Sequence, residues 1–232
     1  PFEVLVDADG RYRAQTHAMT YVTSGRELLA MGVTAPTKSG PLVVADPDYD
    51  AAMADVHVAE AAVNRPDGLA TRSRAMQDVK WTRLEGTTTE AKFIERMLSG
   101  ARTATREAAG EGVLKAAAGP SILHVATHGF FLENQPELES AGRGFKPGSD
   151  AGLSPAELAR IEDPLLRSGL VFAGANQPPG AGEDGVLTAS EAAGLDLWGT
   201  RLVVLSACET GVGDSKVGQG VYGLRRAFTL AG

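Results

Sequence analysis

Two short segments carry the side chains that could do chemistry in this chain. Residues 121–129 read Ser-Ile-Leu-His-Val-Ala-Thr-His-Gly, and residues 201–211 read Arg-Leu-Val-Val-Leu-Ser-Ala-Cys-Glu-Thr-Gly. Each is a run of β-forming residues that ends near a reactive side chain, His128 in the first and Cys208 in the second. A thiol becomes a useful nucleophile when a base takes or holds its proton. If both strands end at the same sheet edge, the pattern indicates a Cys-His hydrolase.

The elements that must position these residues are apolar strands alternating with helices. The sequence predicts strands over 41–45, 81–84, 121–127 and 201–207, and helices over 89–109, 190–197 and 217–230, the first of these capped by Thr89. This alternation is typical of an α/β fold whose parallel sheet is covered on both faces. Reactive groups in such sheets lie at the carboxyl ends of the strands. Asp46, His128 and Cys208 each stand at such an end.

Composition excludes several functional classes. The chain has 232 residues, of which 43% are hydrophobic, so it can bury a substantial core. Its net charge of -7 argues against direct binding to nucleic acid, which would need a basic surface. Its single cysteine cannot form an internal disulfide, which fits a reducing cytoplasm. It has neither an apolar run long enough to span a membrane nor a signal-peptide pattern, so we predict a cytoplasmic protein with no membrane partner.

Ordered sequence blocks point to a family. The blocks include His-Val-Ala-Thr-His-Gly, Leu-Leu-Arg-Ser-Gly-Leu, Gly-Val-Leu-Thr-Ala-Ser-Glu and Val-Val-Leu-Ser-Ala-Cys-Glu-Thr-Gly, and they lie at 124–129, 165–170, 185–191 and 203–211. The ending at 220–228 and the earlier stretches 21–28 and 41–50 follow the same order. In these blocks the chain resembles CHAT domains, which are similar to caspases, separases and gingipains. The resemblance implies a caspase-like three-layer α/β/α sandwich with a mostly parallel central sheet, formed by residues 1–232 as a single domain.

The resemblance also implies a site and an activity. His128 and Cys208 would form the catalytic dyad, and the backbone amides of Gly129 and Cys208 would form the oxyanion hole. The implied function is a cysteine endopeptidase of bacterial type that cleaves a specific protein partner. Two alternatives stay open: a catalytically silent caspase-like interaction module, and a non-peptidase thiol hydrolase or acyltransferase that uses the same dyad.

The sequence departs from the caspase pattern in two ways. His128 and Cys208 are 80 positions apart, whereas about 50 residues separate the pair in the caspase signature. We therefore interpret residues 132–186 as an insert, with a lid or regulatory role. The chain starts without Met and ends soon after Cys208. We interpret it as incomplete at both ends and expect two partners: the downstream strands of the domain, and an N-terminal tetratricopeptide-repeat region or regulatory protein.

Simpler roles compete with catalysis for several residues. His124 lies on the same strand face as His128, and we expect it to pack and hydrogen-bond rather than react. A zinc site at these two histidines is disfavoured because a four-residue spacing suits a helix, and no second cysteine is present. Asp46, Asp48 and Asp50 lack the loop glycine and terminal glutamate of a calcium-binding EF-hand. We therefore expect no metal and no cofactor.

Asp46 and Asp48 are the candidate substrate-binding residues. They begin the loop after the first core strand, which helps to line the pocket for the residue before the cut in caspase-like folds. Pro47 stiffens this turn by fixing its backbone angle. A carboxylate held there would bind arginine in a bidentate manner. The sequence therefore predicts cleavage after Arg or Lys, with Asp46 the main anchor; alternatively, these aspartates cap the next helix or face water.

Overall fold

The computed structural model describes residues 4–20, 22, 25, 28, 33, 35–52, 73–76, 79–132, 162–178, 183–207 and 219–232. The chain forms two compact units, residues 1–35 and 36–232. The first contains the short helix α1 (Arg13–Thr16) and an antiparallel bridge between Val6 and Tyr12. The second contains the sheets and the predicted site. Cys208 lies outside the described residues.

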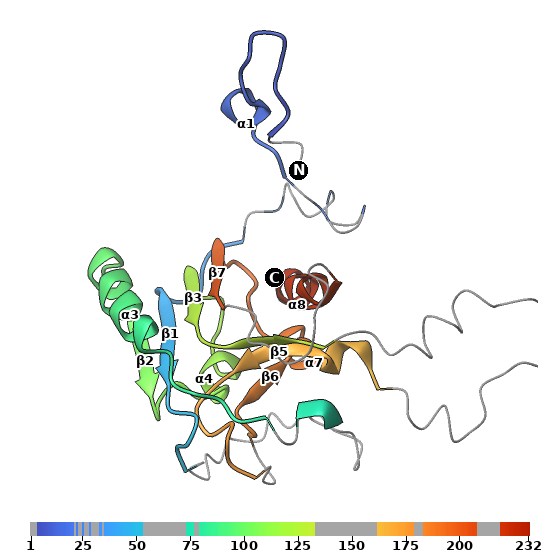
Figure 1. The fold of residues 1–232 in the computed structure, drawn as a ribbon. Coiled ribbons are helices and arrows are strands. Elements are labelled where there is room, and N and C mark those ends of the chain that lie inside the picture. Colours follow the sequence, from blue (N-terminus) through green and yellow to red (C-terminus); the bar gives the residue numbers. More distant parts are fainter. Residues whose placement is uncertain are drawn as a thin grey trace, which may run out of the picture. The chain divides into compact units, whose positions relative to one another are not determined.

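Four parallel strands form the central sheet of the second unit (Figure 1). They are β1 (Leu42–Pro47), β2 (Arg102–Arg106), β3 (Ile122–Ala126) and β7 (Leu202–Ser206), in the order β2-β1-β3-β7. The predicted strands over 41–45, 121–127 and 201–207 are therefore confirmed. β3 and β7, which lead to the two candidate catalytic residues, are direct neighbours.

Three antiparallel strands form a second, smaller sheet. They are β4 (Gly129–Phe131), β5 (Ser168–Val171) and β6 (Val186–Thr188), in the order β4-β5-β6. All four residues of β5 and all three of β6 are buried. This part of the region interpreted as an insert, residues 132–186, therefore belongs to the core. The lid or regulatory role expected for residues 132–186 stays a prediction, and residues 133–161 and 179–182 of this region lie outside the described residues.

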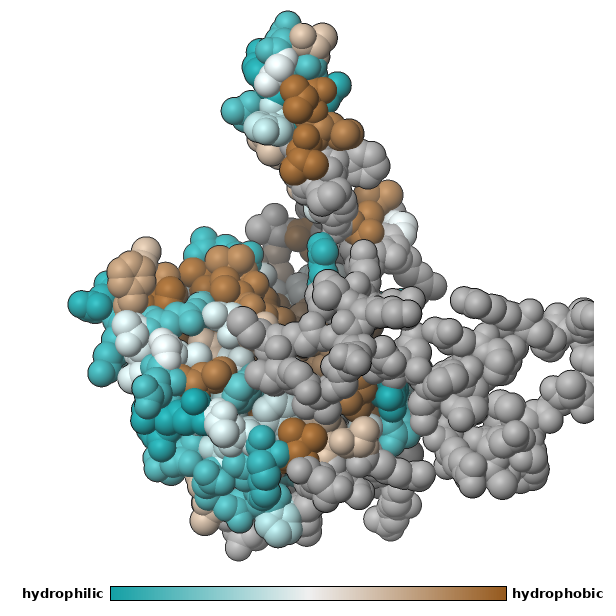
Figure 2. Space-filling model, in the orientation of Figure 1, coloured by the Kyte–Doolittle hydropathy of each residue, from teal (hydrophilic) through white to brown (hydrophobic). Residues whose placement is uncertain are grey.

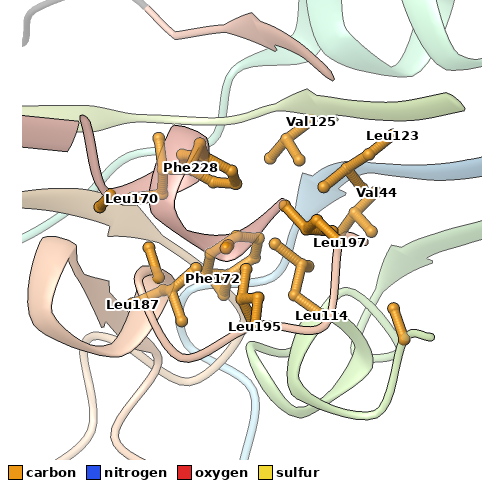
Figure 3. Close-up of a cluster of buried hydrophobic side chains, with 14 of the residues drawn as sticks. Val44, Leu114, Leu123, Val125, Leu170, Phe172, Leu187, Leu195, Leu197 and Phe228 are labelled. Atoms are coloured by element: carbon orange, nitrogen blue, oxygen red, sulfur yellow. The ribbon is translucent and has the colours of Figure 1, made fainter. Parts of the chain in front are cut away.

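Helices and the second sheet cover the two faces of the central sheet. The described helices of this unit are α3 (Glu85–Met97), α4 (Gly112–Lys115), α7 (Ala189–Ala192) and α8 (Gln219–Ala231), with short 3-10 turns at η2 (Arg74–Met76) and η3 (Pro164–Leu166). On one face Val43, Ala45 and Ala126 pack against Ala91 of α3. The opposite face belongs to the main core, in which Val44 and Val125 lie with Phe172 and Phe228 (Figure 3). The layered α/β fold with a mostly parallel sheet is therefore confirmed.

The boundaries of the first long helix and of its neighbouring strands differ from the prediction. α3 starts at Glu85 and ends at Met97, so Thr89 lies inside the helix, and the predicted extension to 109 is wrong. Gly100, with φ +75°, follows the helix, and the chain then forms β2. Residues 81–84, predicted as a strand, have no regular secondary structure.

Hydrophobic and hydrophilic residues divide the visible surface of this unit. Phe93 and Met97 on α3 and Leu202 at the start of β7 are exposed large hydrophobic residues. Figure 2 shows brown and tan residues gathered near the C-terminal end of α3 and the start of β7. Teal residues predominate where β1 and β2 end. None of the helices in the described ranges is both long and apolar enough to cross a membrane.

Candidate functional site

His128 follows the end of β3 and contacts two aromatic rings. Its ring centroid is 5.3 Å from that of Tyr49, which follows β1, and 5.3 Å from that of Trp81. The residue is only 4% exposed. Tyr49 and Trp81 are also buried, so the imidazole lies in an environment that is largely shielded from water. We call these two rings the His128 clamp.

The hydrogen bond of His128 defines the chemistry of its two ring nitrogens. Nε2 lies 2.7 Å from the backbone carbonyl oxygen of Thr82. Because a carbonyl oxygen only accepts, Nε2 must donate, and the neutral ring therefore carries its proton on Nε2. Nδ1 is buried and has no hydrogen-bond partner within the described ranges. This leaves Nδ1 as the nitrogen that can accept a proton.

Burial determines the charge of the His128 ring. Loss of solvent lowers the pKa of His128, and the hydrogen bond to Thr82, which favours the charged ring, acts in the opposite direction. The residue is therefore a neutral base near pH 7. If it accepts a proton at Nδ1, the Nε2–H group still points at the Thr82 carbonyl, which then stabilises the imidazolium.

A buried hydroxyl pair fixes Tyr49. The Thr127 hydroxyl forms a short hydrogen bond to the backbone carbonyl of Val171, so it accepts from the Tyr49 hydroxyl 3.0 Å away. Burial raises the pKa of Tyr49, and the ring stays uncharged beside His128 at neutral pH. This chain of hydrogen bonds joins the loop after β1 to the end of β3 and to β5.

The sheet brings the residue before Cys208 close to the residue after His128. The β3–β7 register pairs Ala126 with Ser206, and the Thr127 amide donates to the carbonyl of Ser206 over 3.2 Å. Further along, a β-carbon placed on Gly129 would lie 3.3 Å from Cβ of Ala207, the residue after Ser206. The segments that follow β3 and β7 therefore remain close as far as Gly129, at the start of β4, and Ala207.

Asp46 and Asp48 each have an arginine partner from this chain. Asp46 is 2% exposed, and its two carboxylate oxygens accept from Nε and Nη2 of Arg83 at 2.8 and 2.7 Å. Asp48 accepts from Nη2 of Arg106 at 2.7 Å. The hydrogen bond from Arg83 holds the pKa of Asp46 below its usual value. The bidentate cation that we expected from a substrate is thus, in this structure, Arg83 at Asp46.

His124 has a separate, structural setting, as predicted from its strand position. It is buried, and its Nε2 lies 2.9 Å from a carboxylate oxygen of Glu90 in α3. The other oxygen of Glu90 accepts from the hydroxyl of Ser206 at 3.1 Å. Glu90 therefore links α3 to both β3 and β7, and His124 contributes to this packing.

A comparison with models of protein families shows the family to which this chain belongs. The CHAT domain model matches residues 1–232, the whole chain. The chain belongs to the CHAT domain family. Searches of curated proteins and of solved structures each returned no match. This CHAT domain is a member of a caspase-like family that is related to cysteine peptidases.

Several residues of the site in this CHAT domain were not predicted from the sequence. Tyr49, Trp81 and the Thr82 carbonyl all contact His128, and Asn176 binds the backbone of Trp81. Trp81 could have been identified from the sequence, since a large aromatic residue in a polar segment is often buried against another part of the chain. The backbone carbonyl and Asn176 have no motif that would have revealed them. In the ranges that the structure describes, no group of three or more His, Cys, Asp or Glu residues is arranged to hold a metal ion.

Proposed function

We propose that this CHAT domain is a cysteine endopeptidase in which Cys208 is the nucleophile and His128 is the base. The observation that carries the proposal is the setting of His128. Its Nε2–H group donates to the Thr82 carbonyl, and its buried Nδ1 has no hydrogen-bond partner in the described part of the chain. An unpartnered buried nitrogen costs free energy, so a functional proton donor there would explain it.

The strand arrangement supports Cys208 as that donor. β3 and β7 are adjacent and parallel with a constant offset of 80 positions, which is also the separation of His128 and Cys208. Ala207 is adjacent to Gly129, and consecutive Cα atoms are about 3.8 Å apart across a trans peptide. Cys208 follows Ala207 directly in the sequence, so the closeness of Ala207 to Gly129 supports the proposed pairing of Cys208 with His128.

The proposed reaction uses each of these groups in turn. Nδ1 of His128 accepts the thiol proton, and the thiolate attacks the scissile carbonyl carbon to form a tetrahedral intermediate. The amides of Gly129 and Cys208 are the proposed donors to its oxyanion, each worth about 3–4 kcal/mol. Imidazolium Nδ1–H then protonates the leaving amine, and a thioester remains. His128 next takes a proton from water, whose oxygen attacks the thioester; the acid product leaves and the thiol re-forms.

Cleavage after Arg or Lys remains part of the proposal. A cationic substrate side chain would bind Asp46 or Asp48 by replacing its arginine partner, Arg83 or Arg106. Such an exchange keeps each carboxylate paired, so its cost is small compared with leaving a buried charge without a partner. In the alternative interpretation, the two ion pairs only stabilise the loop, and other residues determine the cleavage specificity.

A peptide-library digest tests the function directly. Proteome-derived peptides are incubated with wild type, with Cys208→Ala and with His128→Ala, and new termini are counted by mass spectrometry. We expect cuts after Arg or Lys with wild type only, and a changed profile with Asp46→Ala. Cuts after other residues, or an unchanged profile in Asp46→Ala, would refute the pocket. Turnover of free esters without peptide cuts would identify a thiol hydrolase, and no Cys208-dependent turnover at all would favour a silent interaction module.

A further inference from the structure

The segment that presents Thr82 to His128 has no secondary structure to hold it in place. Residues 79–84, which we call the strap, contribute both the Trp81 ring and the Thr82 carbonyl to the environment of His128. The strap belongs to neither sheet. Backbone hydrogen bonds hold its two ends, from Val79 to Met76 and from Thr87 to Leu84, and between them side chains from other segments bind it.

Asn176 binds the strap on one side of Thr82. Its side-chain Oδ1 accepts from the Trp81 amide at 2.8 Å, and its Nδ2 donates to the Trp81 carbonyl at 2.9 Å. One carboxamide thus satisfies both backbone groups of Trp81, as a neighbouring strand would. The Asn176 carbonyl also accepts from Nζ of Lys80 at 2.7 Å.

The same residue holds the loop that carries the other ring of the His128 clamp. The backbone amide of Asn176 donates to the carbonyl of Tyr49 at 2.9 Å, and its Nδ2 donates to the carboxylate of Asp50 at 2.8 Å. Asn176 therefore contacts both Tyr49 and Trp81, which come from separate parts of the chain.

A second anchor lies on the other side of Thr82. Arg83, the next residue, is bound through two hydrogen bonds to the buried carboxylate of Asp46. The Thr82 carbonyl is thus flanked by Trp81, held by Asn176, and by Arg83, held by Asp46. Without substrate, these two neighbours restrict the position of the carbonyl that accepts from His128; if a substrate cation displaces Arg83 from Asp46, the Asn176 anchor still holds Trp81.

We infer that Asn176 is a positioning residue for His128, acting through Tyr49, Trp81 and the Thr82 carbonyl. Its effect on catalysis rests on the proposed function, but its effect on the His128 ring does not. Removal of the carboxamide leaves the amide and carbonyl of Trp81, a 5% exposed residue, without these partners, so the strap must move to reach water. Loss of the Thr82 bond then frees the ring, and misplacement of a catalytic group by about 1 Å costs about 100-fold in rate.

Nitrogen-15 NMR of His128 tests the inference without any thiol chemistry. Spectra are recorded in a Cys208→Ala background over a range of pH, with the His128 signals assigned by their loss in His128→Gln. Tyr49 is the titratable side chain in ring contact, and burial keeps it neutral over this range; the carboxylate of Asp46 is paired with Arg83. We expect a single Nε2–H tautomer with a lowered pKa in the parent. In Asn176→Ala we expect mixed tautomers and a His128 pKa closer to 6.5, the ordinary value.

Gln177 supplies the matched control. Its Nε2 donates to the Asp50 carbonyl at 2.7 Å, so Gln177→Ala removes a hydrogen bond to the same loop but none to Trp81. We expect the His128 tautomer and pKa to be unchanged in this variant. If Asn176→Ala does not fold, Asn176→Asp keeps the acceptor for the Trp81 amide but replaces both Nδ2 bonds with an oxygen that repels the Trp81 carbonyl and the Asp50 carboxylate, and mixed His128 tautomers are again expected. A folded Asn176→Ala or Asn176→Asp with the parental tautomer and pKa would overturn the inference.

Iodoacetamide labelling separates this inference from the proposed function. Cys208 is the only cysteine of the chain, so the second-order rate constant at pH 7 reports on this thiol alone. We expect the constant to fall about tenfold in Asn176→Ala and to change less than twofold in Gln177→Ala. If wild type itself reacts as an ordinary thiol while Asn176→Ala still alters the His128 spectrum, the dyad is refuted and the positioning role stands. A rapid wild-type reaction that Asn176→Ala leaves unchanged would refute the role of Asn176 in catalysis.

Discussion

The Nε2–H group of His128 donates to the Thr82 carbonyl over 2.7 Å, a bond between residues 46 positions apart in the chain. The bond assigns a single tautomer to the ring and leaves Nδ1 as the basic nitrogen. Burial lowers the pKa of the same ring, so a neutral imidazole is built into the fold. The predictions below follow from this relationship and from the contacts around it.

The first prediction concerns the pH dependence of folding at His128. Its folded-state pKa lies below 6.5, so the unfolded chain binds the proton first as the pH falls. We expect the free energy of unfolding to decrease from about pH 6.5 downwards until the folded-state pKa is passed. Urea titrations in a Cys208→Ala background measure it, and His128→Gln should show a flatter curve over this window. Parallel curves for the two proteins would contradict the lowered pKa.

Asp46 is expected to stabilise the loop after β1 through Arg83. Asp46→Asn removes a charge-assisted pair and should lower the free energy of unfolding by about 1.5–3 kcal/mol at pH 7. The pKa of Asp46 is lowered, so this difference should shrink as the pH falls below about 3.8 towards the folded-state pKa. Asp46 has φ +49°, which asparagine tolerates better than alanine. Asp46→Ala should therefore be less stable than Asp46→Asn by about 1 kcal/mol, and equal stabilities would be evidence against this.

Two glycines near the site should respond differently to the same substitution. A β-carbon on Gly129 would lie 3.3 Å from Cβ of Ala207, so Gly129→Ala needs a small shift beside Cys208 and should cost about 1 kcal/mol. A β-carbon on Gly169 would lie 2.5 Å from the Leu187 carbonyl oxygen and 2.8 Å from the Phe130 ring. Gly169→Ala should cost about 3 kcal/mol or more. Urea denaturation compares the two, and a larger loss for Gly129→Ala would contradict the close packing of β5 against β4 and β6.

Glu111 gives a pH dependence of the opposite sign, away from the site. Its side-chain oxygen Oε1 accepts from the amides of Asp184 and Gly185 at 2.7 and 3.2 Å. Burial, reinforced by the carboxyl of Glu183, raises the pKa of Glu111 to about 9. The stability that it contributes is therefore fully present below about pH 4.5 and is lost as the pH rises through 9. Urea midpoints at pH 5, 7 and 9 should fall less steeply in Glu111→Gln, and identical slopes would show that Glu111 does not hold the proton.

The parts of the fold that could be predicted are those whose sequence reflects burial on both faces. β1, β3 and β7 are continuous apolar runs, and their alternation with helices predicted the parallel sheet. β2 reads Arg-Thr-Ala-Thr-Arg, which resembles a polar loop, because it lies at the edge of the sheet. Residues 81–84 of the strap were predicted as a strand from their alternation, yet the backbone groups of Trp81 and Thr82 bond to Asn176 and His128 instead.

Only those residues of the candidate site that follow a core strand were predicted from the sequence. His128 and Gly129 stand out because reactive or flexible residues end an apolar run. The groups that determine the tautomer and burial of His128 come from distant segments and include a backbone carbonyl, which has no sequence signature. Asp46, in β1, and Asp48, just after it, were predicted to bind a substrate guanidinium, but sequence alone could not reveal that Asp46 is paired with Arg83.

The measurement that tests the central claim most directly is the pH dependence of iodoacetamide labelling at Cys208. Rate constants are determined from pH 5 to 10 for wild type, His128→Gln and His124→Gln, the last changing a buried histidine of the same strand that bonds to Glu90. A dyad predicts that wild type reacts with an apparent thiol pKa well below about 8.5, that His128→Gln returns it to that value, and that His124→Gln does not. Superimposable profiles for wild type and His128→Gln, both with an ordinary thiol pKa, would contradict the account.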